Sequence, residues 1–144
     1  MQPLPHHYTV SAEAAPSGAV TLGSSGIEPL RSDGPAEFDG PGDLWSPETL
    51  LTAALVDCFV LSFRAVARAS RFEWNRLDCR AEGTLERIDR VTSFTAFTVK
   101  ARLEVPSGSD IERARKLLAK AEEVCLISNS LKGSHRLEAE VVLV

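Results

Sequence analysis

The most reactive side chains of this 144-residue chain are its three cysteines, Cys58, Cys79 and Cys125. A cysteine thiolate is a nucleophile and is oxidised reversibly to a sulfenic acid, which a second thiol converts into a disulfide. Cys79 alternates with Leu77 and Ala81, so we expect a small buried side chain in a sheet. Cys58 lies in the middle of a helical pattern, and its position alone also indicates packing. Three free thiols fit a reducing compartment.

Other classes of site and partner are disfavoured by residue spacing and charge. The histidines His6, His7 and His135 have no metal-ligand spacing relative to the cysteines, so we expect no metal site and give all three surface or packing roles. The net charge is −4, with both signs mixed along the chain, and there is no basic-groove or zinc-finger pattern. We therefore expect neither nucleic acid nor a membrane as a partner.

The element that must position Cys58 is a helix predicted over 46–70. Ser46 is a suitable N-cap, and Glu48 places a carboxylate in the first turn, where the helix dipole favours it. Apolar side chains fall on nearly every side of this helix, so protein must enclose it.

The same helix raises the question of membrane insertion. Asp57 and Arg64 interrupt it before about 18 apolar residues accumulate, which argues against a membrane span. The N-terminal residues lack the basic and apolar regions of a secretory signal. We therefore expect a cytoplasmic location.

The rest of the chain predicts strands and a second helix, which starts after Ser109 or Asp110 and ends near Cys125. An irregular Gly- and Pro-rich segment either lines a site or is a surface loop. In chain order, we expect strands at 7–14 and 19–22, the irregular segment at 23–44, the central helix, strands at 77–86 and 96–105 joined by a turn at 88–93, the amphipathic helix, a short helix or loop at 126–133 and a last strand at 136–144.

These elements predict an α+β fold with a single domain over 1–144. A curved antiparallel sheet would cover the buried central helix and the amphipathic helix, which both lie on one side of it. A monomer would leave part of the central helix exposed to water. We therefore expect an intertwined homodimer in which this helix meets its symmetry mate.

Three segments carry a resemblance to a known family. Pro47 to Phe59 combine a Pro-Glu-x-Leu helix start, a run of small residues and a Cys-Phe pair. Cys125 to Leu131 follow a Cys-Pro-x-Ser-x-x-Leu pattern with leucine in place of proline, and Phe38-Asp39-Gly40 is similar to Phe-Glu-Gly. Together they resemble the OsmC/Ohr family of thiol peroxidases. The order of the elements agrees over nearly the whole chain, which implies the OsmC-like fold.

The resemblance implies a cysteine-based peroxidase without a metal or organic cofactor. Cys58 would attack the outer oxygen of an alkyl or lipid hydroperoxide, releasing an alcohol and leaving a sulfenic acid. Cys125 would then form a disulfide with Cys58, and a dithiol reductant, a lipoylated protein or a small thiol, would regenerate both thiols. The candidates for an apolar substrate wall are Phe38, Trp45, Phe59 and Phe63.

The resemblance also implies two charged residues that act on the thiol. Family sites use a glutamate to position an arginine at the dimer interface. Glu48 matches the glutamate but lies about 15 Å from Cys58 along the helix, so it would act across the interface; a carboxylate that only stabilises the helix dipole is the alternative. Glu37 stands where the family has its arginine before Phe38, and Arg31 is the nearest substitute.

Two further hypotheses follow from the residues. The displaced arginine favours a catalytically weak relative that binds a small apolar ligand or a partner. A purely structural dimer with inert thiols is the third hypothesis, and the paired cysteine motifs make it the weakest.

Overall fold

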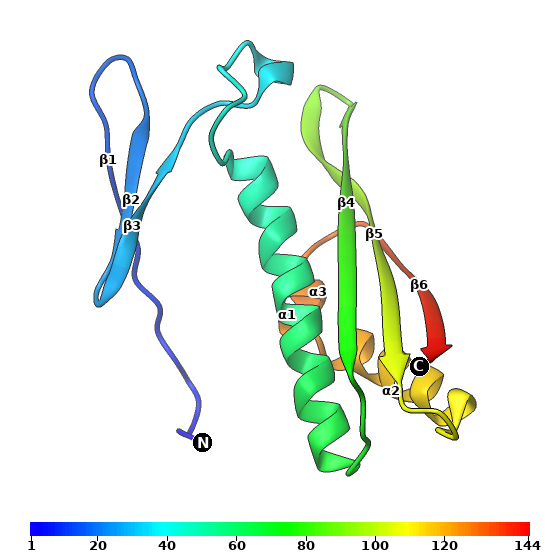
Figure 1. Ribbon diagram of the computed structural model, residues 1–144. Helices are drawn as coiled ribbons and strands as arrows, with labels where there is room; N and C mark the ends of the chain where they lie inside the picture. Colours follow the sequence, from blue (N-terminus) through cyan, green and yellow to red (C-terminus); the bar gives the residue numbers. More distant parts are fainter. The chain divides into compact units, whose positions relative to one another are not determined.

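The computed structural model describes residues 1–144, in two compact units, Met1–Leu50 and Leu51–Val144. The helices and strands confirm the predicted α+β class, whereas the single domain over 1–144 stays a prediction. The elements in chain order (Figure 1) are β1 (Ser11–Glu13), β2 (Val20–Ser24), β3 (Ile27–Ser32), the 3-10 helix η1 (Ala36–Phe38), α1 (Pro47–Ala69), β4 (Arg76–Ile88), β5 (Val91–Val105), α2 (Ile111–Val124), α3 (Leu126–Ser130) and β6 (Ser134–Leu143).

The first unit contains an antiparallel sheet in the order β1-β2-β3. The prediction of an irregular segment over 23–44 is wrong at β3. Strands β2 and β3 are joined by a tight turn in which Gly26 has a φ of 74°. Pro29 hides the strand pattern in the sequence, but β3 is an edge strand, where proline is tolerated because no neighbour needs its missing N–H.

The second unit contains a three-stranded sheet in the order β4-β5-β6. β4 and β5 form the expected antiparallel pair, with Cys79 opposite Ala101, whereas β6 runs parallel to β5, with Leu137 opposite Val99. The purely antiparallel sheet is therefore a wrong prediction, and the sheet is mixed. The physical reason is the connection: helices α2 and α3 separate β5 from β6 and provide the crossover that adjacent parallel strands require.

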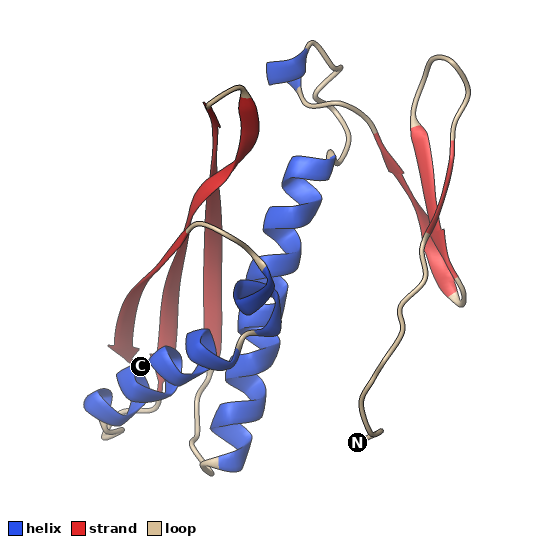
Figure 2. Ribbon diagram, turned by 180° about the vertical axis from the view of Figure 1, so that it is seen from behind, coloured by secondary structure: helices blue, strands red, loops and turns tan.

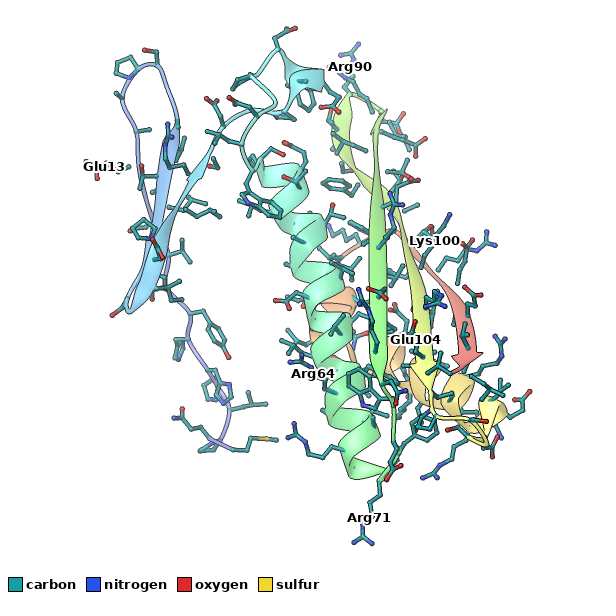
Figure 3. The ribbon with its side chains drawn as sticks, viewed as in Figure 1. Glu13, Arg64, Arg71, Arg90, Lys100 and Glu104 are labelled. Atoms are coloured by element: carbon teal, nitrogen blue, oxygen red, sulfur yellow. The ribbon has the colours of Figure 1, made fainter.

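The turn between β4 and β5 is tighter than the predicted turn at 88–93. It contains two residues, Asp89 and Arg90, with φ values of 51° and 66°, and Arg90 lies at the tip of the hairpin (Figure 3). Two consecutive residues with positive φ match the twist of a two-residue hairpin. The strands consequently pair to their ends, up to Ile88 opposite Val91.

Helix α1 begins with the predicted cap. The N–H of Thr49 donates to Oγ of Ser46 at 3.1 Å, and the N–H of Ser46 donates to Oγ1 of Thr49 at 2.8 Å. This reciprocal pair satisfies donors that the first helical turn leaves without partners. From there α1 continues without a break to Ala69.

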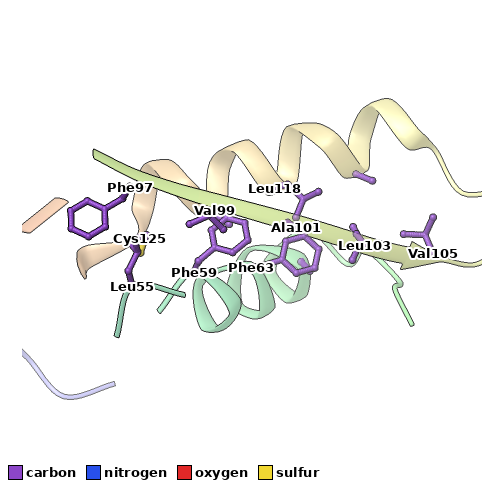
Figure 4. Close-up of a cluster of buried hydrophobic side chains, with 13 residues drawn as sticks. Leu55, Phe59, Phe63, Phe97, Val99, Ala101, Leu103, Val105, Leu118 and Cys125 are labelled. Atoms are coloured by element: carbon purple, nitrogen blue, oxygen red, sulfur yellow. The ribbon is translucent and has the colours of Figure 1, made fainter. Parts of the chain in front are cut away.

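The core of the second unit lies between one stripe of α1, the inner face of β5 and one face of α2. The helices lie on the same side of the sheet (Figure 2), and the opposite side carries charged residues such as Lys100 and Glu104 (Figure 3). Every second residue of β5 from Phe97 to Val105 is buried, as the alternation predicts. The fully buried helix residues (Figure 4) are Leu55, Phe59, Phe63 and Ala67 on α1, and Ala114, Leu118 and Ala121 on α2.

Outside this stripe, α1 carries exposed charged residues such as Asp57 and Arg64, but also apolar side chains that the chain does not enclose. Leu61, for example, is 51% exposed. By length and by a mean hydropathy of 1.9, α1 passes the test for a helix that could cross a membrane, a test that the core helix of a globular domain passes as well. The argument that Asp57 and Arg64 exclude a membrane span is therefore wrong. One stripe of α1 is buried against the sheet, and 22% of the apolar window is buried inside the structure.

The core packing predicts a contrast between two positions on α2. Leu118→Ala should lower the free energy of unfolding by about 2–5 kcal/mol, because it leaves a cavity under a fully buried side chain. Lys116→Ala, at an exposed position of the same helix, should change it by less than about 0.5 kcal/mol. Urea unfolding followed by circular dichroism measures both. Equal losses would show that the inner face of α2 is not part of the core.

Candidate functional site

Cys125 occupies the junction between α2 and α3. It is both the C-cap of α2 and the N-cap of α3. Its φ of −63° and ψ of 108° are extended backbone angles, which end one helix before the next begins. Its N–H donates to the carbonyl of Glu122 at 3.3 Å, and its carbonyl accepts from the N–H of Asn129 at 3.0 Å. The side chain is fully buried, at the same end of the core as Leu55 and Phe97 (Figure 4).

Cys58 approaches Cys125 from α1. It is half-buried and packs against the core cluster to which Cys125 belongs. Its Sγ lies 3.9 Å from Oγ of Ser62, one helical turn further on. A hydrogen bond with Cys58 and the charge of Cys58 both raise the pKa of the Cys125 thiol, so the two side chains lie close together. The structure therefore brings together two cysteines that are far apart in the sequence.

The environment of Cys125 opposes its ionisation. Burial raises the pKa of the Cys125 thiol to about 11, and hydrogen bonding to Cys58 and the charges of Cys58 and Glu122 act in the same direction. The backbone N–H of Ser128 acts in the opposite direction and favours the thiolate. A thiolate at Cys58 thus keeps Cys125 protonated, so the pair can hold one negative charge more easily than two.

The third cysteine has a packing environment. Cys79 is half-buried on β4 and contacts the core. Burial, followed by the charge of Asp78, raises the pKa of the Cys79 thiol to about 11. This agrees with the expectation of a small apolar side chain in a sheet.

A network of three side chains adjoins Cys125, and the sequence analysis missed it. Oγ of Ser128 donates to Oε1 of Glu122 at 2.7 Å and lies 3.0 Å from Nδ1 of His135. Nε2 of His135 lies 3.2 Å from the carbonyl oxygen of Leu131, and its ring stacks on Phe97 at 5.4 Å. The ring of His135 packs on Phe97, as expected for a packing residue, and both of its nitrogens also lie within hydrogen-bond distance of a partner.

A signal for part of this network is present in the sequence. Glu122 stands three residues before Cys125 and Ser128 three residues after it, so both fall within one turn of the thiol. His135 gives no such signal, because only the parallel pairing of β6 places it beside Phe97.

The other predicted site residues fall into two groups. Phe59 and Phe63 are fully buried in the core, and Phe63 meets Trp74 edge-to-face at 5.3 Å. The remaining residues belong to the first unit: Phe38 and Trp45 are 59% and 48% exposed, Arg31 is exposed on β3 opposite Thr21, and Glu48 is in the first turn of α1. Their roles in a site stay predictions. No group of three or more His, Cys, Asp or Glu residues is arranged to hold a metal ion.

Two bacterial proteins are similar to this chain in sequence. The Bacillus subtilis protein YmaD, which is uncharacterised, is 32% identical over 114 residues, covering 74% of this chain and 73% of its own length. Peroxiredoxin OsmC of Escherichia coli is 26% identical over 96 residues, covering 67% of this chain and 66% of its own.

Solved structures of OsmC-like proteins have a fold similar to that of this chain. An OsmC-like protein of unknown function from Vibrio cholerae superposes with a TM-score of 0.86 at 19% identity, covering 94% of this chain and all of the other. An organic hydroperoxide resistance protein OsmC from Legionella pneumophila gives a TM-score of 0.74 at 25% identity, with 98% and 100% covered. The family model described as OsmC-like protein matches residues 40–140, and the chain therefore belongs to the OsmC-like family.

Proposed function

We propose that this protein is a cysteine-based reductase of organic hydroperoxides, with Cys58 as the attacking thiol and Cys125 as the resolving thiol. The observation that carries the proposal is the interaction between these two side chains at the end of the core. The names of two relatives, a peroxiredoxin and an organic hydroperoxide resistance protein, support the same reaction class.

The reaction has three steps. The sulfur of Cys58 attacks the outer oxygen of ROOH, the O–O bond breaks, and ROH leaves while Cys58 becomes a sulfenic acid. The sulfur of Cys125 then displaces hydroxide from the Cys58 sulfur, and the thiol proton leaves with this hydroxide as water. A dithiol reduces the resulting disulfide and is itself oxidised, which restores both thiols.

Burial and charge support this division of roles. Cys58 is half-buried, whereas Cys125 is fully buried. A bulky hydroperoxide can reach the first thiol but not the second. The raised pKa of the Cys125 thiol also keeps it protonated near neutral pH until Cys58 has been oxidised.

The proposal extends to a homodimer and to residues of the first unit. One stripe of α1 is buried within the protomer, and its remaining apolar surface needs a cover, which a second copy of α1 would supply. In this dimer Glu48 would act across the interface, Arg31 would stabilise the Cys58 thiolate, and Phe38 and Trp45 would hold the organic part of the substrate. A cytoplasmic location and a lipoylated or small dithiol reductant complete the proposal.

Loss of the attacking thiol should abolish turnover. Cys58→Ser should reduce the rate of cumene hydroperoxide consumption by at least about a hundredfold, to the uncatalysed rate, because burial raises the pKa of both other thiols, Cys79 and Cys125, to about 11 and keeps them protonated. Cys79→Ser is the matched control and should retain most of the activity. Equal, slow consumption by wild type and Cys58→Ser would instead favour a ligand-binding relative without efficient catalysis.

Loss of the resolving thiol should change the oxidised product. After one equivalent of hydroperoxide, peptide mapping of the wild type by mass spectrometry should show a Cys58–Cys125 disulfide. In Cys125→Ser, Cys58 should accumulate as sulfenic acid and, with excess peroxide, as sulfinic acid, because nothing condenses with it. A wild-type protein that over-oxidises as readily as this variant would remove Cys125 from the mechanism.

Arg31 is tested by the rate of the first step. Arg31→Ala should slow single-turnover oxidation of Cys58 about tenfold, because a nearby cation favours the thiolate. Arg87→Ala, near the end of β4, serves as a control for the loss of one positive charge. An unchanged rate in Arg31→Ala would exclude Arg31 as the substitute for the family arginine.

A further inference from the structure

Glu122, Ser128 and His135, here called the clamp, connect three elements at the buried thiol. Glu122 is in the last turn of α2, Ser128 is in α3 and His135 is near the start of β6. Ser128 is 6% exposed, and Oε2 of Glu122 is buried without a hydrogen-bond partner. The clamp plays no part in the three steps described above, although it adjoins the residue that closes the disulfide.

The hydrogen bonds of the clamp require one additional proton. The hydroxyl of Ser128 has a single hydrogen but stands between two groups that can accept it, Oε1 of Glu122 and Nδ1 of His135. Nε2 of His135 faces a carbonyl oxygen, so it must carry a hydrogen. All three bonds form when His135 is an imidazolium beside a carboxylate, or when Glu122 is protonated and His135 is neutral.

These two forms contain the same number of protons and differ only in where the protons lie along the network. When the clamp loses that proton, the Ser128 hydroxyl satisfies only one of its two acceptors, and a net negative charge stays beside Glu122. The buried Oε2 has no donor that would offset this charge, so its electrostatic effect extends into the core.

The clamp acts on Cys125 in two ways. Ser128 holds the start of α3, whose backbone N–H favours the Cys125 thiolate, and the negative charge of Glu122 opposes it. The other group that acts on this thiol is Cys58 on α1. The ring of His135 otherwise meets Phe97 of β5 and the backbone of Leu131, which carry no charge. A proton gained or lost by the clamp therefore changes the charge near Cys125.

We propose that Glu122, Ser128 and His135 are positioning residues for Cys125, and that the proton they share determines how readily this thiol closes the disulfide with Cys58. The inference rests on the proposed function and identifies what controls its second step. A protonated clamp is neutral and favours attack by Cys125, whereas a deprotonated clamp places a negative charge beside the nascent thiolate and slows the attack. The step itself consumes no proton from the clamp, because the thiol proton leaves in water.

The test measures attack by Cys125 without any peroxide. In a Cys79→Ala background, an aromatic disulfide reagent reacts with Cys58 and releases one coloured thiolate; Cys125 then attacks the mixed disulfide and releases a second. The logarithm of the second rate is plotted against pH between about 5 and 8, the range in which histidine charges change. For the wild type, the logarithm of the rate should rise with pH with a slope of one both below and above the pH at which the clamp loses its proton. Above that pH the rate should lie about threefold below the line extrapolated from low pH.

Two variants and two controls decide the outcome. His135→Phe keeps an aromatic ring on Phe97 but cannot be protonated, so it should follow the slower line at every pH. Glu122→Gln can still accept from Ser128 without a charge, so it should react about threefold faster than wild type at high pH. Glu123→Gln, next in the chain and exposed beside Lys120, and His7→Phe, in the exposed N-terminal segment, should match the wild type.

A single straight line for the wild type, or an unchanged profile in His135→Phe, would overturn the proposal. The same would follow if Glu123→Gln accelerated the reaction as much as Glu122→Gln. Failure of the proposed function is seen separately. If the protein releases the second thiolate with the predicted pH profile but consumes no hydroperoxide, the role of the clamp stands and the peroxidase function does not. Absence of the second release would overturn both.

Discussion

The packing of α1 against the inner face of β5 is the constraint on which the site depends. Protein interiors are close-packed, so a helix that buries side chains at every fourth position cannot rotate about its axis without leaving cavities. Leu55, Phe59 and Phe63 form such a stripe and fix the rotation of α1. Cys58 precedes Phe59 and is therefore held at the edge of the core. The apolar contact that stabilises the fold also gives the thiol a defined direction.

The second thiol depends on the crossover from β5 to β6. Helix α2 leaves the end of β5, runs back across the sheet, and must stop before β6 can start beside β5. It stops at Cys125, and the chain turns into β6 through Gly133, whose φ is 91° and where a Cβ atom would lie 2.5 Å from the carbonyl oxygen of Thr95. Glycine is required at this approach. The close contact with β5 fixes the point at which the chain enters β6 after α3.

The features that could be predicted from the sequence are those that report burial. Alternation identified β4 and β5 with their inward faces, and the cap residues Ser46 and Asp110 located the starts of α1 and α2. Burial patterns do not say which neighbour a strand pairs with. The direction of β6 and the edge strand β3 could therefore not be predicted from the sequence. The clamp was missed for the same reason, since its histidine reaches Ser128 only through that parallel pairing. The approach of Cys58 to Cys125 came from the family resemblance rather than from spacing.

The position of Cys125 between two helices has a consequence for the disulfide proposed between Cys58 and Cys125. A disulfide fixes two sulfurs about 2.05 Å apart and sets the torsion angles on both sides, so at least one thiol must move when the bond forms. Cys58 lies inside an unbroken helix whose hydrogen bonds resist local rotation. Cys125 has extended backbone angles at a helix junction, where a change in ψ disrupts few hydrogen bonds. The movement therefore falls on the α2–α3 junction, the segment whose hydrogen bonds to β6 run through Ser128 and His135. Local geometry and the proton on the clamp thus act on the same motion.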